Sequence, residues 1–282
     1  MSMEYDLKAP LVFDVIYRSA LAAAGREPLL RTYLEHAVLE CDSLDMALAR
    51  LLSAQLETAM LGREPLYDIC REAFAADPDL IEQAAADLIA VCQRDPASQM
   101  DYAIPFLYLK GCQALESYRV AHWLCGSGRH DLALYLQSVI SRVYGVDIHP
   151  QAVIGRGIMI DHATGVVIGQ TAVVADNVSL MQAVTLGGTG KEEGDRHPKI
   201  SEGVLIGAGA RVLGNIRVGR CAKIGAGSVV LSDVPAHSTV VGVPARVVDS
   251  QLRGVPSQDM RQDVGLQNTF IGSEPQPCLR KT

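Results

Sequence analysis

Histidines, acids and an arginine gather in the middle of the chain, where their types suit acid–base chemistry. His162 follows Asp161, Arg196 precedes His197, and His149 lies a short way upstream. A histidine has an ordinary pKa of about 6.5, so near neutral pH it can take a proton from a hydroxyl group. An arginine binds a carboxylate through two parallel hydrogen bonds. Such residues are also common in turns and on surfaces, so the elements that carry them must decide between these interpretations.

The segment that carries these residues repeats every six positions. A six-residue period fits neither a helix nor a single strand, but it fits a short strand followed by a tight turn. Three such units close one triangular coil. Full hexapeptides cover residues 148–165, 168–185 and 200–235, which predicts four stacked coils. The aliphatic residues that recur are Ile148, Ile154, Ile160, Ile168, Val174, Leu180, Leu186, Ile200, Ile206, Val212, Val218, Ile224 and Val230.

The period is interrupted twice. Val166-Val167 is a two-residue slip, and residues 187–199 form a longer insertion that carries Arg196 and His197. Insertions in a solenoid become loops on one face, often the binding face. Asp147 and His162 are separated by 15 positions, close to one coil. We therefore expect them near the same corner of adjacent coils.

Residues 1–145 have the helical period instead and predict an α-helical N-terminal domain. An apolar stripe predicts a helix over 43–56. Asp77-Pro78-Asp79 predicts a helix start, and Gly145 predicts the end of a helix over 130–144. The β-solenoid domain is then expected over 146–249. Residues 250–282 lose the period and predict a flexible C-terminal tail.

Composition excludes several classes of protein. The chain carries 25 basic and 32 acidic side chains, a net charge of −7, which argues against a binder of nucleic acid or anionic membranes. Hydrophobic residues make up 49% of the chain, so general disorder is excluded.

Seven cysteines without a CxxC pair predict reduced thiols, with neither a disulfide framework nor a metal site. The N-terminus lacks the pattern of a signal peptide, and residues 11–25 are too short and too charged to span a bilayer. We expect a cytoplasmic protein.

Short motifs around these residues resemble serine O-acetyltransferases of the hexapeptide-repeat acyltransferase superfamily. In the repeat region they are DIHP (147–150), DHATG (161–165), TLGGTG (185–190), GDRHPK (194–199) and GVPAR (242–246). In the helical region they are RDPA (94–97) and YLKG (108–111). The resemblance implies an α+β fold, with an N-terminal α-helical domain followed by a left-handed parallel β-helix. It also implies a homotrimer formed by the β-helices, or a dimer of trimers joined by the helical domains, and the sequence does not decide between them.

The resemblance further implies the reaction. Acetyl-CoA, as co-substrate, transfers its acetyl group to the hydroxyl of L-serine, giving O-acetyl-L-serine and CoA in cysteine biosynthesis. No permanently bound cofactor and no metal are expected. By resemblance His162 is the general base that activates the hydroxyl, and Asp147 orients its ring. Attack is expected to be direct, in a ternary complex, because no cysteine or serine lies in a motif typical of an acyl-enzyme.

Serine is a small zwitterion, so its site needs a cation and an acid. Arg196, helped by His197, is the candidate for the carboxylate, and Asp161 and Asp95 are candidates for the ammonium group. The alternative for Arg196 and His197 is a solvated loop, and Asp95 could simply cap a helix before Pro96. The stretch after Asp95 is about one residue longer than the family norm, so Asp101 competes for the role.

The acetyl-CoA groove is expected along small residues at the coil corners. By resemblance it passes Gly187, Gly188, Ala208 and Ala226 toward Lys223, which could meet a phosphate. Each small residue is also adequately explained by the turn it occupies. In the family the active sites lie between neighbouring subunits. The helical domain is then expected to serve both oligomerisation and part of the substrate site.

Three alternatives remain open from the sequence. A trimeric β-helix could hold zinc through His149, His162 and His197 and hydrate carbon dioxide, although no two of these histidines are closely spaced. The acetyl acceptor could be a sugar or homoserine, or the chain could be a non-enzymatic scaffold.

Members of the family bind O-acetylserine sulfhydrylase through a C-terminal isoleucine, whereas this chain ends Leu279-Arg280-Lys281-Thr282, which puts that partner in doubt. Inhibition by cysteine at the serine site is a further hypothesis.

Overall fold

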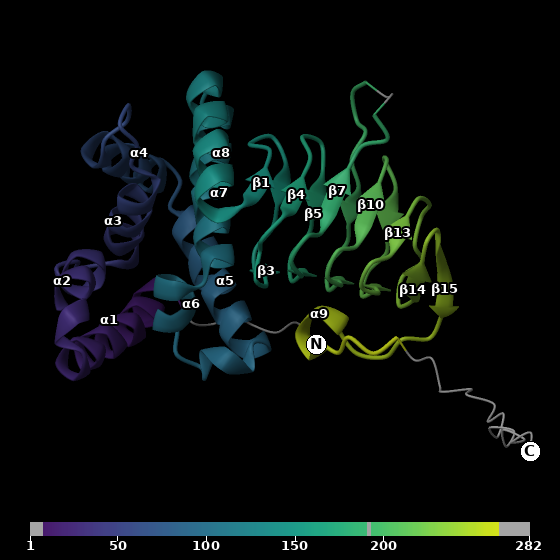
Figure 1. Ribbon diagram of the computed structural model, residues 1–282, viewed down its shortest axis with the longest axis horizontal. Coiled ribbons are helices and arrows are strands. Elements are labelled where there is room, and N and C mark those ends of the chain that lie inside the picture. The colour runs from purple at the N-terminus through teal and green to yellow at the C-terminus, as the bar shows by residue number, and fades with distance from the viewer. Residues whose placement is uncertain (1–7, 191–192, 265–282) are drawn as a thin grey trace, which may run out of the picture.

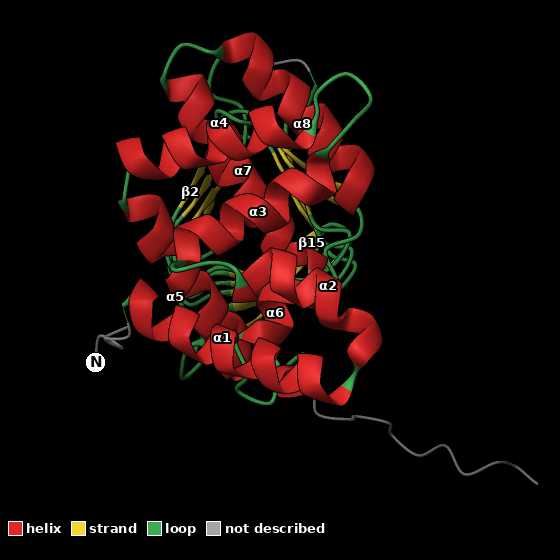
Figure 2. Ribbon diagram, turned by 90° about the vertical axis from the view of Figure 1, so that its left-hand side faces the viewer, coloured by secondary structure: helices red, strands yellow, loops and turns green. Residues whose placement is uncertain are grey.

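Helices cover one end of a triangular β-solenoid. The computed structural model describes residues 8–190 and 193–264, with helices over the first half of the chain and short strands over the second (Figure 1). Viewed from the helical side, the helices form a layer in front of the strands (Figure 2). The expected α+β fold, a helical domain followed by a left-handed parallel β-helix, is confirmed.

The helices begin and end where the local sequence predicts. Ser43 precedes α3, the Asp77 carboxylate accepts a hydrogen bond from Asp79 N at the start of α5, and Gly145 ends α8 with a φ of 68°. The described helices are α1 (Ala9–Arg26), α2 (Arg31–Leu34), α3 (Leu44–Leu56), α4 (Arg63–Ala76), α5 (Asp79–Arg94), α6 (Ala103–Tyr108), α7 (Lys110–Gly126), α8 (His130–Tyr144) and α9 (Pro256–Asp259). Shorter helical turns cover Pro28–Leu30, Glu35–Leu39 and Pro96–Ser98.

Three parallel sheets form the sides of the solenoid. Sheet A holds β1 (Val146–Ile148), β4 (Val166–Ile168), β7 (Thr185–Gly187), β10 (Arg211–Leu213) and β13 (Val229–Val230). Sheet B holds β2 (Val153–Ile154), β5 (Val173–Val174), β8 (Lys199–Ile200) and β11 (Arg217–Val218). Sheet C holds β3 (Met159–Ile160), β6 (Ser179–Leu180), β9 (Leu205–Ile206), β12 (Lys223–Ile224), β14 (Thr239–Gly242) and β15 (Ala245–Asp249). All pairs are parallel except β14 with β15, which closes the far end.

The repeated aliphatic residues fill the inside of the coils. On sheet A, Ile168, Leu186 and Val212 are 0–1% exposed and occupy equivalent positions in successive coils. The offset between paired residues is 20 positions from β1 to β4 (146 to 166) and 18 from β4 to β7 (167 to 185). It is 26 from β7 to β10 (185 to 211) and 18 again from β10 to β13 (211 to 229). The slip and the inserted loop account for the two long offsets.

A buried ionic network joins the helices to the first coil. Arg119 on α7 pairs with Asp87 on α5, and both side chains are almost fully buried. The same guanidinium donates to the carbonyl of Gly155 at 2.8 Å, and Asp87 accepts from Ile158 N at 2.6 Å. Glu116 lies beside this pair; burial raises the pKa of its carboxyl well above the usual range, although Arg119 opposes this. Burial also raises the pKa of the Asp87 carboxyl, but Arg119 and the hydrogen bond from Ile158 N oppose this more directly, so Asp87 is the ion-pair partner of Arg119 and Glu116 holds the proton.

Residues 250–264 form an ordered arm, so the expectation of a flexible tail from Ser250 is wrong for this part. This C-terminal arm turns back along sheet C, and its helix α9 packs against α5 and β9 (Figure 1). Leu252 N donates to His237 O at 2.9 Å and Ser257 N to Gly203 O at 3.3 Å. Backbone hydrogen bonds, which side-chain composition does not reveal, hold the arm. The remainder of that expectation, residues 265–282, lies outside the described residues.

None of the helices in the described part of the chain has the length and apolar character that crossing a membrane requires.

A glycine on α7 lets this helix pack directly against the backbone of the first coil. A Cβ added to Gly111 would lie 2.0 Å from the carbonyl oxygen of Ile160. We expect Gly111→Ala to destabilise the protein by about 1–3 kcal/mol, because backbone must move to admit the methyl group. Gly126, at the other end of α7, has nothing within 4 Å of such a Cβ. Gly126→Ala should therefore leave the thermal midpoint equal or slightly higher. Thermal unfolding of both variants checks this, and equal midpoints would contradict it.

Candidate active site

A cleft of about 380 Å³ lies where α5 and the start of α7 meet the first coil. Asp95, Lys110, Asp161 and His162 line it together with Tyr108. We call it the acidic cleft. Asp95 comes from the end of α5, whereas Asp161 and His162 directly follow β3. The structure thus brings together three residues that the sequence proposed as base and ammonium ligands.

The corner that holds His162 has an unusual backbone. His162 and Ala163 have φ values of 55° and 58°, a left-handed conformation that costs energy for residues with a side chain. Asp161 N donates to Leu180 O at 2.8 Å, which fixes the corner to the next coil. The imidazole Nε2 lies 3.6 Å from the Asp161 carboxylate, and its side chain is 72% exposed. The coil therefore presents an accessible imidazole beside an acid.

Two carboxylates meet in the acidic cleft. Burial raises the pKa of the Asp161 carboxyl above its usual range; His162 opposes this, and the negative charge of Asp95 adds to it. A cation placed between Asp95 and Asp161 would relieve their repulsion. The arrangement therefore suits an ammonium group.

The competition between Asp95 and Asp101 favours Asp95. Asp95 Oδ1 accepts from Ala97 N at 2.8 Å, so the expected capping role is real, and the same residue also lines the cleft. Asp101 Oδ1 accepts from Ala103 N at 3.0 Å at the start of α6, and Asp101 is not among the residues that line the cleft.

A second cluster lies around the corner between sheets A and B, which we call the Arg196 corner. Arg196 Nη2 donates to Gln170 Oε1 at 2.8 Å. His197 is 7% exposed, and its Nδ1 lies 2.9 Å from Thr171 Oγ1. A Cβ on Gly169 would clash with the His197 ring, so the glycine makes room for it. The inserted loop is therefore anchored at its end and does not leave these two residues as solvated side chains.

The imidazoles of this cluster are kept neutral. Burial lowers the pKa of His149, with Asp147 opposing and Arg196 reinforcing the effect. Burial also lowers the pKa of His197, and the charges of Arg196 and Lys199 lower it further. Near neutral pH the cluster thus offers the guanidinium of Arg196 beside two uncharged rings.

Asp147 does not share a corner with His162, so that expectation is wrong. Asp147 is the middle residue of β1, the edge strand of sheet A, and the register places it opposite Val167, beyond the corner of His162, because the two-residue slip lengthens the first coil. Its Oδ1 accepts from Gln137 Nε2 at 2.7 Å. Its charge acts on His149, which places Asp147 with the Arg196 corner rather than with the acidic cleft.

The candidate groove residues fall on two different corners. The corner between sheets C and A, which we call the His162 corner, carries Ala208 and Ala226 in later coils; Gly227 N donates to Ala208 O at 2.8 Å. Gly187 and Gly188 instead lie on the Arg196 corner, where a Cβ on Gly188 would be 3.5 Å from Arg196 Cγ. The single expected groove is thus split within one chain.

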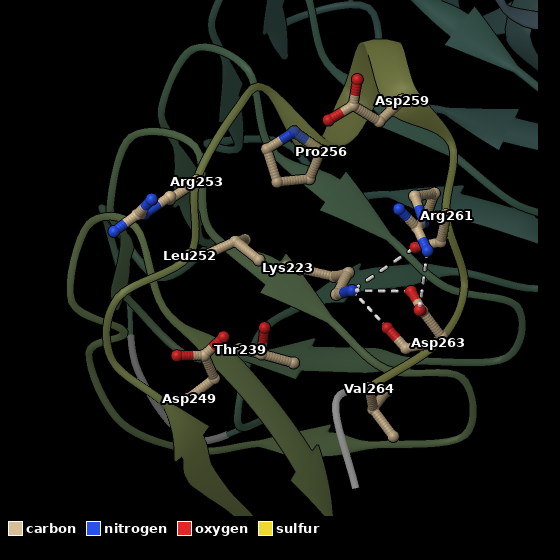
Figure 3. Close-up of a pocket in the computed structure, with 10 residues that line it drawn as sticks. All are labelled: Lys223, Thr239, Asp249, Leu252, Arg253, Pro256, Asp259, Arg261, Asp263 and Val264. Atoms are coloured by element: carbon tan, nitrogen blue, oxygen red, sulfur yellow. Dashed lines mark hydrogen bonds and ion pairs between the residues drawn. The ribbon is translucent and has the colours of Figure 1, made fainter. Parts of the chain in front are cut away.

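Lys223 is occupied by the C-terminal arm. Its side chain is 8% exposed, and its Nζ donates to the carbonyl oxygens of Arg261 and Asp263 and pairs with the Asp263 carboxylate at 3.7 Å (Figure 3). The expectation that Lys223 faces an open groove is therefore wrong for this structure. The tail appeared irregular in sequence, so its docking on Lys223 could not be read from it.

Sequence reasoning missed two groups of supporting residues. Lys110 lines the acidic cleft and its Nζ donates to Thr164 Oγ1, beside His162. Gln170 and Thr171 hold Arg196 and His197. The YLKG motif gave a signal for Lys110, whereas nothing local marked the other two.

Comparisons with known proteins agree with this architecture. The N-terminal region of serine acetyltransferases matches residues 12–117, and the bacterial transferase hexapeptide family (six repeats) matches residues 197–232. A serine acetyltransferase of Salmonella typhimurium is 52% identical over 261 residues, 92% of this chain and 95% of the relative.

Solved structures give the same result. The serine acetyltransferase of Vibrio cholerae superposes with a TM-score of 0.87 at 55% identity, covering 89% of this chain and 97% of the other. That of Brucella abortus, in complex with coenzyme A, gives 0.84 at 46% identity, over 85% and 96% of the two chains. The soybean enzyme complexed with serine gives 0.83 at 51% identity, over 85% and 98%.

The charge on Arg196 should be visible in the titration of His197. We expect the pKa of His197 to lie below its ordinary value of about 6.5 and to rise in Arg196→Gln, because a nearby positive charge is removed. The pH dependence of the ring proton shifts in NMR measures this. Arg220→Gln, which removes an exposed arginine paired with Glu202, is the control and should leave the His197 titration unchanged. A fall, or no movement, in Arg196→Gln would contradict the arrangement.

Proposed function

The chain belongs to the serine acetyltransferase family, and we propose that its acidic cleft and its Arg196 corner together form the site of the reaction. The enzyme transfers the acetyl group of acetyl-CoA to the hydroxyl of L-serine, giving O-acetyl-L-serine and CoA. The observation that carries the assignment of residues is the meeting of Asp95, Asp161 and His162 in one cleft.

Serine recognition follows from the charges of the two clusters. The ammonium group binds between Asp95 and Asp161, which places the hydroxyl beside His162. Arg196 receives the carboxylate through its planar guanidinium, and the neutral His197 donates or accepts a further hydrogen bond. A sugar has no ammonium group to place between the carboxylates, and homoserine would carry its hydroxyl one carbon further from them. Both alternatives are therefore disfavoured as acceptors.

His162 acts as the general base. The serine oxygen attacks the thioester carbonyl while His162 Nε2 accepts the hydroxyl proton. The tetrahedral intermediate then collapses, the C–S bond breaks, and the sulfur leaves with the proton that His162 held. Asp161, 3.6 Å from Nε2, stabilises the imidazolium that forms between these steps. Asp147, which lies with the Arg196 corner, acts on it from the neighbouring subunit in the assembly proposed next. No acyl-enzyme is needed.

The two corners come from neighbouring subunits in this proposal. Within one chain Arg196 and His162 lie on different edges of the triangular coil, so one chain alone does not surround a serine molecule. A homotrimer that places the Arg196 corner of one subunit against the His162 corner of the next completes the site. The same contact joins Gly187 and Gly188 to Ala208 and Ala226 as the two walls of the acetyl-CoA groove.

The helical domain, residues 1–145, supplies Asp95 and would also carry any pairing of two trimers. Cytoplasm is the proposed location, since the six described cysteines are free thiols, which persist in a reducing compartment. The segment through which O-acetylserine sulfhydrylase could bind lies beyond Val264, outside the described residues, and that partner stays a prediction.

We expect His162→Ala to lower kcat by at least about 100-fold, because the general base is lost. His237→Ala is a matched control, since His237 also lies at a coil corner with a φ of 54°. Release of the CoA thiol, with L-serine, L-homoserine, a galactoside or no acceptor, measures turnover, and the elution volume of each variant measures assembly. Near-normal turnover of His162→Ala would remove His162 from the mechanism. Release with homoserine or the galactoside alone would contradict the serine assignment.

Mixed trimers test the shared site. Two inactive variants, His162→Ala and Arg196→Gln, should regain up to about one quarter of the wild-type activity when their subunits are mixed, because one interface in four then has both intact corners. Mixing His162→Ala with Asp161→Asn should give no recovery, since both residues come from one corner. Recovery with Asp147→Asn would place Asp147 on the neighbouring subunit. No recovery in the first mixture would contradict the shared site.

A further inference from the structure

The C-terminal arm reaches the back of the acidic cleft through two buried side chains. Ser257, in α9, accepts a hydrogen bond through its carbonyl oxygen from Ser179 Oγ at 2.8 Å. The same hydroxyl accepts from Arg94 Nη1 at 3.1 Å. Ser179 and Ser257 are fully buried and Arg94 is 5% exposed. The hydroxyl of Ser179 therefore connects the arm to the last residue of α5.

Arg94 immediately precedes Asp95, and its guanidinium fixes that end of α5 to the second coil. It donates to Val178 O at 3.4 Å and to Asn177 Oδ1 at 3.3 Å, in addition to Ser179. Burying a guanidinium is costly unless its donors are satisfied, so these oxygens define where the side chain can lie. Because Asp95 is the next residue, fixing Arg94 also fixes where the Asp95 backbone lies.

The strand that Arg94 holds is also the strand that supports the base. β6 pairs with β3, where Ser179 lies opposite Met159, and Val178 O accepts from Met159 N at 3.1 Å. Two residues after Met159 comes Asp161. Arg94 thus links the backbones of the two carboxylates that face each other in the acidic cleft.

We propose that Arg94 and Ser179, completed by the Ser257 carbonyl of the C-terminal arm, are positioning residues that set the separation of Asp95 and Asp161 for the ammonium group of the substrate. This rests on the proposed role of Asp95. The arm is then part of substrate recognition, although none of its described residues lines the acidic cleft. Neither Arg94 nor Ser179 touches the substrate.

Discrimination against a substrate that lacks the ammonium group tests this role. 3-Hydroxypropionate carries the hydroxyl and carboxylate of serine without the ammonium group. The ratio of kcat/KM for L-serine to that for 3-hydroxypropionate is measured in the full-length enzyme. Asp95→Asn should lower this ratio at least about tenfold, the scale of a lost hydrogen bond to a charged group. Ser179→Ala and Arg94→Lys should lower it about three- to tenfold, with the KM for acetyl-CoA unchanged.

A matched control separates positioning from general destabilisation. Ser238 is another fully buried serine of the β-helix, whose hydroxyl donates to Pro235 O at 2.7 Å in the last coil. Ser238→Ala should leave the ratio unchanged whatever it does to the thermal midpoint. Adding Ser179→Ala to Asp95→Asn should lower the ratio no further, because both act on the same interaction.

The outcomes distinguish the two proposals. A reduced ratio in Asp95→Asn with a wild-type ratio in Ser179→Ala and Arg94→Lys overturns the positioning role and leaves the ammonium site intact. A further fall in the double variant also overturns it. A wild-type ratio in Asp95→Asn itself removes Asp95 from ammonium binding, and the positioning role falls with it.

Discussion

The buried pair of Arg119 and Asp87 is the interaction on which the geometry of the acidic cleft depends. Asp87 lies on α5, which ends directly before Asp95, and it accepts from Ile158 N, directly before the strand that leads to Asp161. Arg119 adds the carbonyl of Gly155. Removing one partner of such a pair leaves an uncompensated buried charge, typically at a cost of about 3–5 kcal/mol. The pair therefore fixes the helices against the first coil, and this placement also determines the shape of the cleft between them.

A neutral Glu116 beside this pair keeps the network from carrying two negative charges against one positive charge. Burial disfavours its ionised form, and a hydrogen bond with Asp87 favours the protonated form. The network between the helices and the first coil is thus polar but carries no net charge, which suits its burial. The acidic cleft differs from it, because Asp95 forms no ion pair with the residues that the structure describes, and in our proposal the ammonium group of the substrate supplies the cation.

The sequence predicts the fold well because its main signal is a repeated one. The six-residue period and the glycine at position 145 place the solenoid and its start, and α3, α5 and α8 follow from their own apolar stripes and caps. The site is predicted less completely. The partner of Asp147 depends on a register that two extra residues change, and the contacts of Lys223 depend on how an irregular segment folds back. The Asp87–Arg119 pair is absent from the sequence-based prediction, because a charged residue on a helix gives no local sign that it will be buried.

The stacking of the solenoid gives the proposed groove a fixed scale. Each coil advances the His162 corner by one strand spacing, about 4.8 Å, and Ala208 and Ala226 stand two and three coils beyond His162. The number of coils therefore sets the length of the groove, from the reacting thioester to the far end of the CoA molecule that carries it. A chain that gained or lost one complete coil between Ala183 and Ala208 would keep its core and its base. Its groove would, however, fit an acyl carrier that is longer or shorter than CoA by one strand spacing.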